Sequence, residues 1–232
     1  GIVIGAVVLA GTAVMGFPPE GYDPLVSPPP ADRHPIETLE CAPGEMIRRK
    51  SFWLLYAMGT CTMMAGMGVI SSARSLVLSI APDAALGTVA FMAGILSVAS
   101  AAGRVFTGFL NDIVGVRANI RISSVAITAA TLLVMCAVMS GNLPFLAVSF
   151  ALCGFSCGMC IPAAAVVTAK LFGARHYQVN LEIMMSCGIL HAFAATFVGA
   201  MYDAAGTYVL PVLVLALTGF LGAVCSFRIR KP

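Results

Sequence analysis

Long runs of uncharged, mostly apolar residues constrain this chain more than any other feature. Charged residues are absent from 51–73, 89–103, 122–169, 183–202 and 204–227. A helix needs about 20 apolar residues to cross the hydrocarbon core of a bilayer, where no water satisfies an exposed backbone group. Hydrophobic residues make up 59% of the chain and charged residues only 10%, so lipid is the solvent that this composition suits. The sequence predicts an all-α fold, a polytopic membrane helix bundle.

The number of spans follows from where the runs break. The run 122–169 is about twice as long as one span needs to be, and Gly141-Asn142-Leu143-Pro144 divides it with residues typical of a tight turn. The predicted spans are 1–17, 52–73, 87–110, 119–140, 143–168, 182–203 and 208–227.

The spans group unevenly along the chain. Residues 1–17 lack the features of a signal peptide and are interpreted as the end of a transmembrane helix from a preceding N-terminal half. The Pro-rich segment 18–50 is interpreted as a cytoplasmic linker, 51–227 as a six-span unit and 228–232 as a cytoplasmic tail. One span, a linker and six spans are what remains when a protein of two six-helix halves is cut within its sixth helix.

Basic residues fall on one side of the predicted membrane. Counting alternate loops places 11 of the 13 Lys and Arg residues beside the linker and tail, with Arg74 on the other side and Arg104 inside a span. The positive-inside rule makes that side cytoplasmic. We expect an integral protein of the plasma (inner) membrane with the linker and C-terminus in the cytoplasm, and nothing indicates nucleic-acid binding.

The eight cysteines do not predict a disulfide framework or a metal site. Seven of them lie in predicted spans, where Cys153, Cys157 and Cys160 share one helix face without a nearby His or carboxylate. We interpret them as packing residues. We also expect neither an enzyme nor a cofactor, because the sequence holds no nucleophile–base pair, metal-ligand spacing or Gly-rich phosphate loop.

The most specific motif is G-x-x-x-D-x-x-G-x-R, formed by Gly108, Asp112, Gly115 and Arg117 between two predicted spans. We expect Gly108 to permit close helix contact and Gly115 to let the chain turn. Asp112 would lie near a helix N-terminus, where the macrodipole favours an anion, and Arg117 could pair with it. Such a cluster could gate by holding one conformation and releasing it in another. The alternative is an ordinary polar loop.

This motif resembles the signature of the major facilitator superfamily, in the copy found in the second half. Other stretches are similar to the oxalate/formate antiporter-like family of carboxylate transporters. They are FPPEGYDP (17–24), SFWLLYAMG (51–59), GVISSARSL (68–76), AAGRVFTGFLND (101–112), KLFG (170–173) and GAMYDAAGTY (199–208). The resemblance implies that 51–227 is the six-span C-terminal half of a transporter.

Arg104 is the first candidate for substrate contact. It lies eight residues before Asp112, so about 12 Å into its span at 1.5 Å per residue. Cations at that depth are costly and usually face a cavity, and a guanidinium offers two parallel donors to a carboxylate. The resemblance implies the same role, because an arginine in this helix is thought to anchor the substrate. The alternative is an arginine that snorkels to the surface or holds a neighbouring helix.

His191 is the second candidate, in the middle of the span 182–203. A histidine titrates near physiological pH, so it could relay a proton or bind an anion; the alternative is a neutral histidine bonded inside the bundle. The resemblance to oxalate-specific members implies a lysine near Ser186-Cys187-Gly188, and this chain has none there. A single cation suits a monocarboxylate better than a dianion.

Together these features predict a secondary active transporter of small organic anions that works by alternating access, as an antiporter or proton symporter. Its partners would be the anion, the lipid bilayer and the missing N-terminal half, with possible proton coupling. Two alternatives stay open. One is a carrier of the same superfamily for a non-carboxylate substrate such as a drug or sugar. The other is a non-transporting membrane sensor of the same fold, in which Arg104 would be buried against protein.

Overall fold

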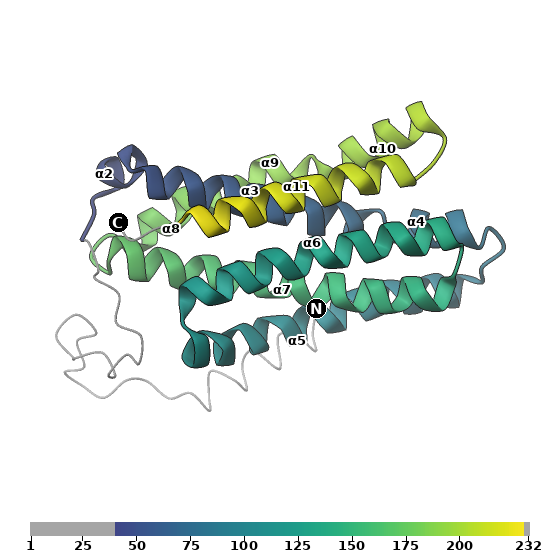
Figure 1. Ribbon diagram of the computed structural model, residues 1–232, viewed down its shortest axis with the longest axis horizontal. Helices are drawn as coiled ribbons and strands as arrows, with labels where there is room; N and C mark the ends of the chain where they lie inside the picture. Colours follow the sequence, from purple (N-terminus) through teal and green to yellow (C-terminus); the bar gives the residue numbers. More distant parts are fainter. Residues whose placement is uncertain (1–39, 230–232) are drawn as a thin grey trace, which may run out of the picture. The chain divides into compact units, whose positions relative to one another are not determined.

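A computed structural model of the chain describes residues 40–229, which are almost entirely helical (Figure 1). All of them belong to the second of two compact units into which the chain divides, Ile36–Pro232. The predicted span 1–17, the linker up to residue 39 and the tail from residue 230 lie outside the described residues. Everything below concerns the second unit.

Six helical runs in the described residues are long and apolar enough to cross a membrane. They are α3 (Lys50–Ser71), α5 (Leu86–Val114), α6 (Val116–Ser140), α7 (Leu143–Phe172), the run of α8 (Tyr177–Met185), α9 (Cys187–Ala192) and α10 (Ala194–Ala205), and α11 (Val209–Arg228). Two short helices, α2 (Pro43–Arg48) and α4 (Ala73–Ile80), complete the set. The runs coincide with the six predicted spans after the linker, and the all-α membrane bundle is confirmed.

The helices extend beyond the spans predicted from charge-free runs. After a break at Ser72 the chain continues as α4, so Arg74 lies near the start of a helix and not at a helix C-terminus. Likewise α7 runs to Phe172 and passes Pro162 without interruption. The reason is that charged residues end the apolar run at the membrane surface, whereas helical hydrogen bonding continues into the polar interface.

The predicted turn between α6 and α7 is present. Gly141 ends α6 in the left-handed region (φ 64°), which glycine adopts without a Cβ penalty. The Asn142 side chain then accepts a hydrogen bond from the Phe145 N–H at 3.0 Å and caps α7. Pro144 lies in the first turn of α7, where its missing N–H costs nothing.

The spans differ in how deeply they are buried. Helices α3, α6, α7 and α11 are the most buried of the six, whereas α5 and the α8–α10 run are the least buried. Helix α5 packs mainly on α7, α9 packs mainly on α3, and α10 packs on both α3 and α11 (Figure 1). The bundle therefore has four central helices with one more exposed span against α7 and another against α3.

Glycines bring α5 and α7 into backbone contact. A Cβ added at Gly154 or Gly158 of α7 would collide with the carbonyl groups of Leu96 and Ser100 on α5, and one at Gly103 would collide with the Phe155 carbonyl. Gly154 and Gly158 form a G-x-x-x-G pair that brings two helices together. In lipid, where apolar burial drives helices together only weakly, such close packing holds neighbours in place.

The end of the linker docks onto the turn between α7 and α8. Cys41 donates its backbone N–H to the Phe172 carbonyl at 3.1 Å and accepts from the Asn180 side-chain amide at 3.1 Å. The Glu40 carboxylate accepts from the backbone N–H groups of Ala174 (3.3 Å) and Arg175 (3.0 Å). This segment is therefore part of the bundle and not a free linker.

The α5–α7 contact predicts that alanine substitution of one glycine of α5 lowers stability and that the same substitution at another glycine does not. Gly103→Ala should destabilise the full-length protein by about 1–3 kcal/mol, because the new methyl group meets a backbone carbonyl that cannot rotate away. Gly94→Ala is the matched control, since Gly94 lies on the same helix and a Cβ there meets nothing within 4 Å. Thermal unfolding in detergent should show a lower midpoint for the first variant only, and equal midpoints would contradict the packing.

The docked carboxylate predicts a local change in backbone protection. Glu40→Ala should speed amide hydrogen exchange at Ala174 and Arg175 by roughly tenfold, because hydrogen bonds to a charged group contribute about 1.5 kcal/mol or more. Glu182→Ala serves as the control, since Glu182 accepts from the Gln178 side chain at 3.0 Å and not from a backbone group. Unchanged exchange in the Glu40 variant would exclude the docking.

Candidate substrate-binding site

A cavity of about 400 Å³ opens between α3, α4, α5 and α7, and Arg104 lines it. We call it the arginine cavity. Its lining residues are Met63, Met67, Ile70, Ala73, Ala93, Leu96, Ser97, Ser100, Ala101, Arg104, Cys157 and Ile161. Arg104 of α5, the predicted substrate contact, thus faces a space bordered by α3, α4 and α7 and is not buried against protein.

No acidic group among residues 40–229 pairs with Arg104. Its side chain is exposed and makes no hydrogen bond or ion pair within that range. Arg104 lies ten residues before the end of α5, which is about 15 Å along the helix. A guanidinium at this depth attracts an anion, because little water is present to screen its charge.

Polar residues on α5 lie in line with Arg104. Ser97 and Ser100 line the same cavity at helical spacing from Arg104, so the three side chains share one face. Gly108 and Asp112 follow at intervals of four residues, and both are exposed. One exposed face of α5 therefore runs from the cavity to the motif at the helix end. Sequence analysis missed the two serines, although their spacing from Arg104 could have indicated them.

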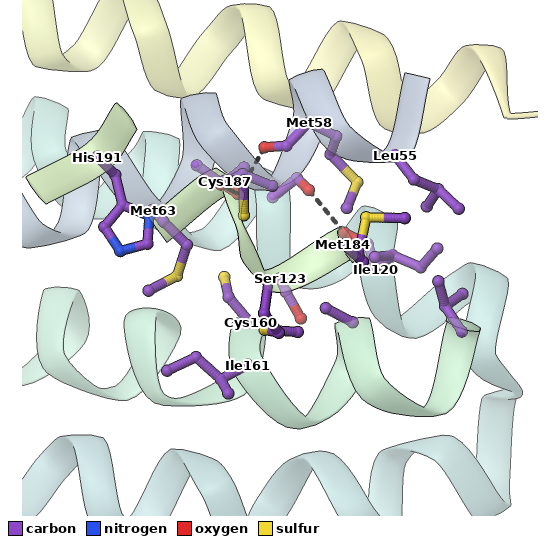
Figure 2. Close-up of a pocket in the computed structure, with 16 residues that line it drawn as sticks. Leu55, Met58, Met63, Ile120, Ser123, Cys160, Ile161, Met184, Cys187 and His191 are labelled. Carbon is purple, nitrogen blue, oxygen red and sulfur yellow. Dashed lines mark hydrogen bonds between the residues drawn. The ribbon is translucent and has the colours of Figure 1, made fainter. Parts of the chain in front are cut away.

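A second cavity, of about 110 Å³, lies between α3, α6, α7, α8 and α9 (Figure 2). We call it the histidine cavity. Its lining residues are Leu55, Met58, Gly59, Thr62, Met63, Ile120, Ser123, Ser124, Cys160, Ile161, Ala164, Val167, Met184, Met185, Cys187 and His191. His191 lies at one end of it and Leu55 and Met184 toward the other (Figure 2).

The hydroxyl groups of the histidine cavity are occupied within their own helices. Thr62 donates to the Met58 carbonyl at 2.7 Å, Ser123 to Asn119 at 2.8 Å and Ser124 to Ile120 at 2.7 Å. What they leave toward the cavity is mainly methyl, thioether and thiol surface. This cavity therefore suits an apolar group better than a charged one.

His191 is the exception in this lining. Its ring is half-buried, and its Nδ1 atom is buried with no hydrogen-bond partner among the described residues. The alternative prediction was a neutral histidine hydrogen-bonded inside the bundle. No such hydrogen bond is made by Nδ1 among the described residues. The residue lines the cavity while Nδ1 itself is buried, so a partner for Nδ1 would have to come from a small rotation of the ring toward the cavity.

The two cavities share part of their lining. Met63 of α3 and Ile161 of α7 line both, and Figure 2 shows these two side chains near the end that holds His191. Arg104 and His191 thus belong to different cavities that meet at two apolar side chains. The sequence predicted both residues, but it gave no sign that a methionine and an isoleucine lie between their cavities.

The span that carries His191 is interrupted on either side of it. Helices α8 and α9 meet at Ser186, and α9 and α10 meet at Phe193. The Ser186 hydroxyl lies 3.2 Å from the Tyr56 hydroxyl of α3. Ser186 and Cys187 occupy the region in which oxalate-specific members are expected to have a lysine. Ser186 and Phe193 both keep right-handed helical backbone angles, so the helix is irregular at these two points but not unwound.

The G-x-x-x-D-x-x-G-x-R motif is more helical than predicted. Helix α5 continues to Val114 and α6 begins at Val116, so Gly115 alone makes the turn, with φ 79°. Asp112 falls in the last turn of α5, three residues before Gly115, the N-cap of α6, and no described side chain caps α6 by a hydrogen bond. No ion pair joins Asp112 to Arg117 in the described structure. Gly108 makes no close helix contact there; that part is played by Gly103.

A buried polar cluster fastens this turn instead. The Asn119 side chain on α6 donates to the Thr107 hydroxyl at 2.7 Å and to the Asn111 side-chain carbonyl at 2.8 Å, both on α5. Asn119 and Thr107 are almost fully buried. Sequence analysis missed this cluster, although Gly103, Thr107 and Asn111 repeat at four-residue intervals on one face. Hydrogen bonds of this kind hold membrane helices in a fixed register.

No metal site emerges from the described residues. Within 40–229 there is no group of three or more His, Cys, Asp or Glu side chains placed to hold an ion. Cys153 and Cys157 are buried, and Cys157 packs against Gly66 with its sulfur 2.9 Å from where a Cβ would lie.

Comparison with known proteins assigns the family. A search of curated proteins gives no match to this sequence. A family model described as Major Facilitator Superfamily matches residues 56–232, which is most of the chain. That range contains the five spans from α5 to α11, most of α3, the arginine cavity, the histidine cavity except Leu55, and the motif at the α5–α6 turn. The chain belongs to the Major Facilitator Superfamily and is an integral membrane transporter protein of that family.

Proposed function

We propose that this chain carries the carboxylate-binding site of a secondary active transporter for small organic anions, and monocarboxylates in particular. The observation that carries the proposal is Arg104, an exposed guanidinium deep in a membrane-spanning helix, open to a cavity and without an acidic partner in the described residues. A membrane sensor in which Arg104 is buried against protein is disfavoured by the same observation.

The surroundings of Arg104 support a substrate with one charge. Among the residues that line the arginine cavity, Arg104 is the one charged side chain, and two serines stand beside it on α5. A carboxylate can accept two parallel N–H bonds from the guanidinium, while the adjoining apolar residues accommodate a short carbon chain. A dianion would need a second cation, which the span holding Ser186 and Cys187 does not offer.

The coupling mode follows from His191. We propose that it takes up the co-transported proton, because the residue lines a cavity that adjoins the arginine cavity and its Nδ1 has no hydrogen-bond partner among the described residues. In the antiport alternative, a second anion would replace the proton and His191 would be dispensable.

The remaining proposals concern the whole transporter. We propose that this unit is the C-terminal half, resembling oxalate/formate antiporter-like carriers, and that an N-terminal half closes the arginine cavity during alternating access. Gly108 and Asp112 lie exposed on the Arg104 face of α5, where Gly108 leaves room for a facing helix. With Gly115 as the turn and Arg117 beside it, they would gate the basic end, which we place in the cytoplasm at the plasma membrane.

A second candidate is a carrier of a neutral, lipophilic compound such as a drug. The apolar lining of the histidine cavity favours it over a sugar carrier, because a sugar needs free hydrogen-bonding groups and the hydroxyls there are already engaged.

The first test of the proposed function concerns Arg104 as the residue that binds the substrate carboxylate. In vesicles that contain the full-length protein, Arg104→Gln should reduce uptake of the preferred acid at least tenfold, since a charge-assisted hydrogen bond contributes about 1.5–3 kcal/mol. Uptake of formate, lactate, pyruvate and oxalate is measured side by side, with a monocarboxylate expected to be preferred.

Arg74→Gln is the matched control, because Arg74 is exposed at the other end of the bundle and lines neither cavity. Arg104→Lys should retain part of the activity, since it keeps the charge and loses the paired donors. Full uptake by a well-folded Arg104→Gln variant would remove Arg104 from the site. Uptake of no acid by the wild type, together with uptake of a neutral lipophilic compound, would favour the second candidate.

The second test of the proposed function uses His191 to distinguish proton symport from antiport. His191→Asn should abolish accumulation driven by an inward proton gradient while leaving the exchange of labelled for unlabelled substrate within about twofold of wild type, because exchange needs no net proton movement. Proton entry is followed with a pH-sensitive dye inside the vesicles. If the variant still accumulates substrate against its gradient when protons drive it, His191 is not the proton site.

A further inference from the structure

A third hollow lies away from both cavities, in the groove between α6 and α11. It has a volume of about 500 Å³ and is lined by Ala118, Arg121, Ile122, Val125, Ala126 and Phe227. At 3.6 residues per turn, these α6 residues lie on the face opposite Ile120, Ser123 and Ser124, which line the histidine cavity. The groove therefore faces away from the transport site, on helices that span the membrane.

Arg121 lies close enough to the start of α6 for the headgroup of a lipid to reach it. It is the sixth residue of α6, about 7.5 Å along the helix from its start, and Phe227 is the second-last residue of α11. The Arg121 guanidinium carbon lies 5.5 Å from the centre of the Phe227 ring. This cation–π contact holds the side chain over the groove by one face of the guanidinium.

The terminal nitrogens of Arg121 make no hydrogen bond or ion pair within residues 40–229. Its Nε atom is buried without a partner there, so the terminal nitrogens are the donors that a ligand in the groove can reach. Arg228 stands exposed at the end of α11. Arg121 is the arginine that lines the groove, while Arg117 and Arg228 lie at the same end of the bundle, on α6 and α11 respectively.

The balance of charged residues at this end of the bundle also favours an anionic ligand. Eight basic residues of the described chain lie there against four acidic ones. Three of those acids are engaged elsewhere: Glu40 with the α7–α8 turn, Glu45 with the Ala42 N–H at 3.4 Å, and Glu182 with Gln178. The fourth, Asp112, lies in the last turn of α5, and no hydrogen bond or ion pair within residues 40–229 joins it to Arg121. Basic residues therefore exceed acidic ones at this end of the bundle, which favours an anionic ligand.

We propose that the α6–α11 groove binds one anionic phospholipid, with its phosphate on Arg121 and an acyl chain along Ile122, Val125 and Ala126. The lipid matches the site in both parts, since a charged phosphate accepts two guanidinium donors and an acyl chain covers an exposed apolar groove. The site is independent of the transport cavities, so it stands or falls separately from the proposed function.

The experiment measures lipid binding to the purified full-length protein by native mass spectrometry. Phosphatidylglycerol and phosphatidylcholine with the same acyl chains are compared, with glycerol 1-phosphate as a soluble competitor. Wild type should retain phosphatidylglycerol preferentially, and Arg121→Gln should weaken that binding about tenfold, as expected for loss of a charge-assisted hydrogen bond. Arg74→Gln, at the opposite end of the bundle, should bind like wild type.

A second variant keeps the test independent of the arginine. Val125→Trp fills the exposed groove without changing any charge, and it should also weaken phosphatidylglycerol binding several-fold. Equal retention of both lipids, or undiminished phosphatidylglycerol binding in either variant, would overturn the proposal. Displacement of the lipid by millimolar glycerol 1-phosphate would overturn it in favour of a site for free phosphate esters.

Discussion

The backbone contact between α5 and α7 is the interaction on which the rest of the site depends. Gly103, Gly154 and Gly158 allow the two helices to touch through their carbonyl groups, so α5 cannot move sideways or rotate without breaking that contact. Arg104 is the next residue after Gly103. Its direction is therefore set by the contact itself, and the arginine cavity exists because α5 rests on α7 and leaves space toward α3. The Asn119 cluster holds the far end of α5 on α6, so the helix is fixed at two levels.

The two cavities offer a physical route for coupling a proton to an anion. They meet at Met63 and Ile161, and methionine is an unbranched, flexible side chain that can change rotamer at low cost. A proton on His191 would add positive charge near the anion at Arg104, where the low dielectric of the membrane interior strengthens the attraction. Binding of each would favour binding of the other. Neither a long relay nor an additional titratable residue is needed for this mechanism.

The helices were predictable from the sequence, whereas the contacts between them were only partly so. Charge-free runs located all six described spans, because the bilayer demands about 20 apolar residues whatever the packing. The same rule misplaced helix ends at Arg74 and Asp112, since it treats the first charge as the end of a helix. Gly108 was chosen over Gly103 for close contact because the motif drew attention to it. The four-residue repeat of Gly103, Thr107 and Asn111 marks the packed face, and that of Arg104, Gly108 and Asp112 the open one. Which α3 and α7 residues meet Arg104 depends on tertiary packing that no local pattern encodes.

Depth in the membrane explains why two arginines without acidic partners would bind different anions. Arg104 lies about 15 Å from the end of α5, beyond the reach of a headgroup held at the surface, so only an anion that enters the protein can neutralise it. Arg121 lies about half as far from the start of α6 and opens toward lipid, where a phosphate is always near and need not move. A mobile counter-ion suits a carrier, because it must leave again, whereas a resident lipid suits a position that has to keep its place while other helices move. The proposed substrate site and the proposed lipid site would thus be separated by helix depth and by their place in the bundle, since α6 lines the groove of Arg121 but not the arginine cavity.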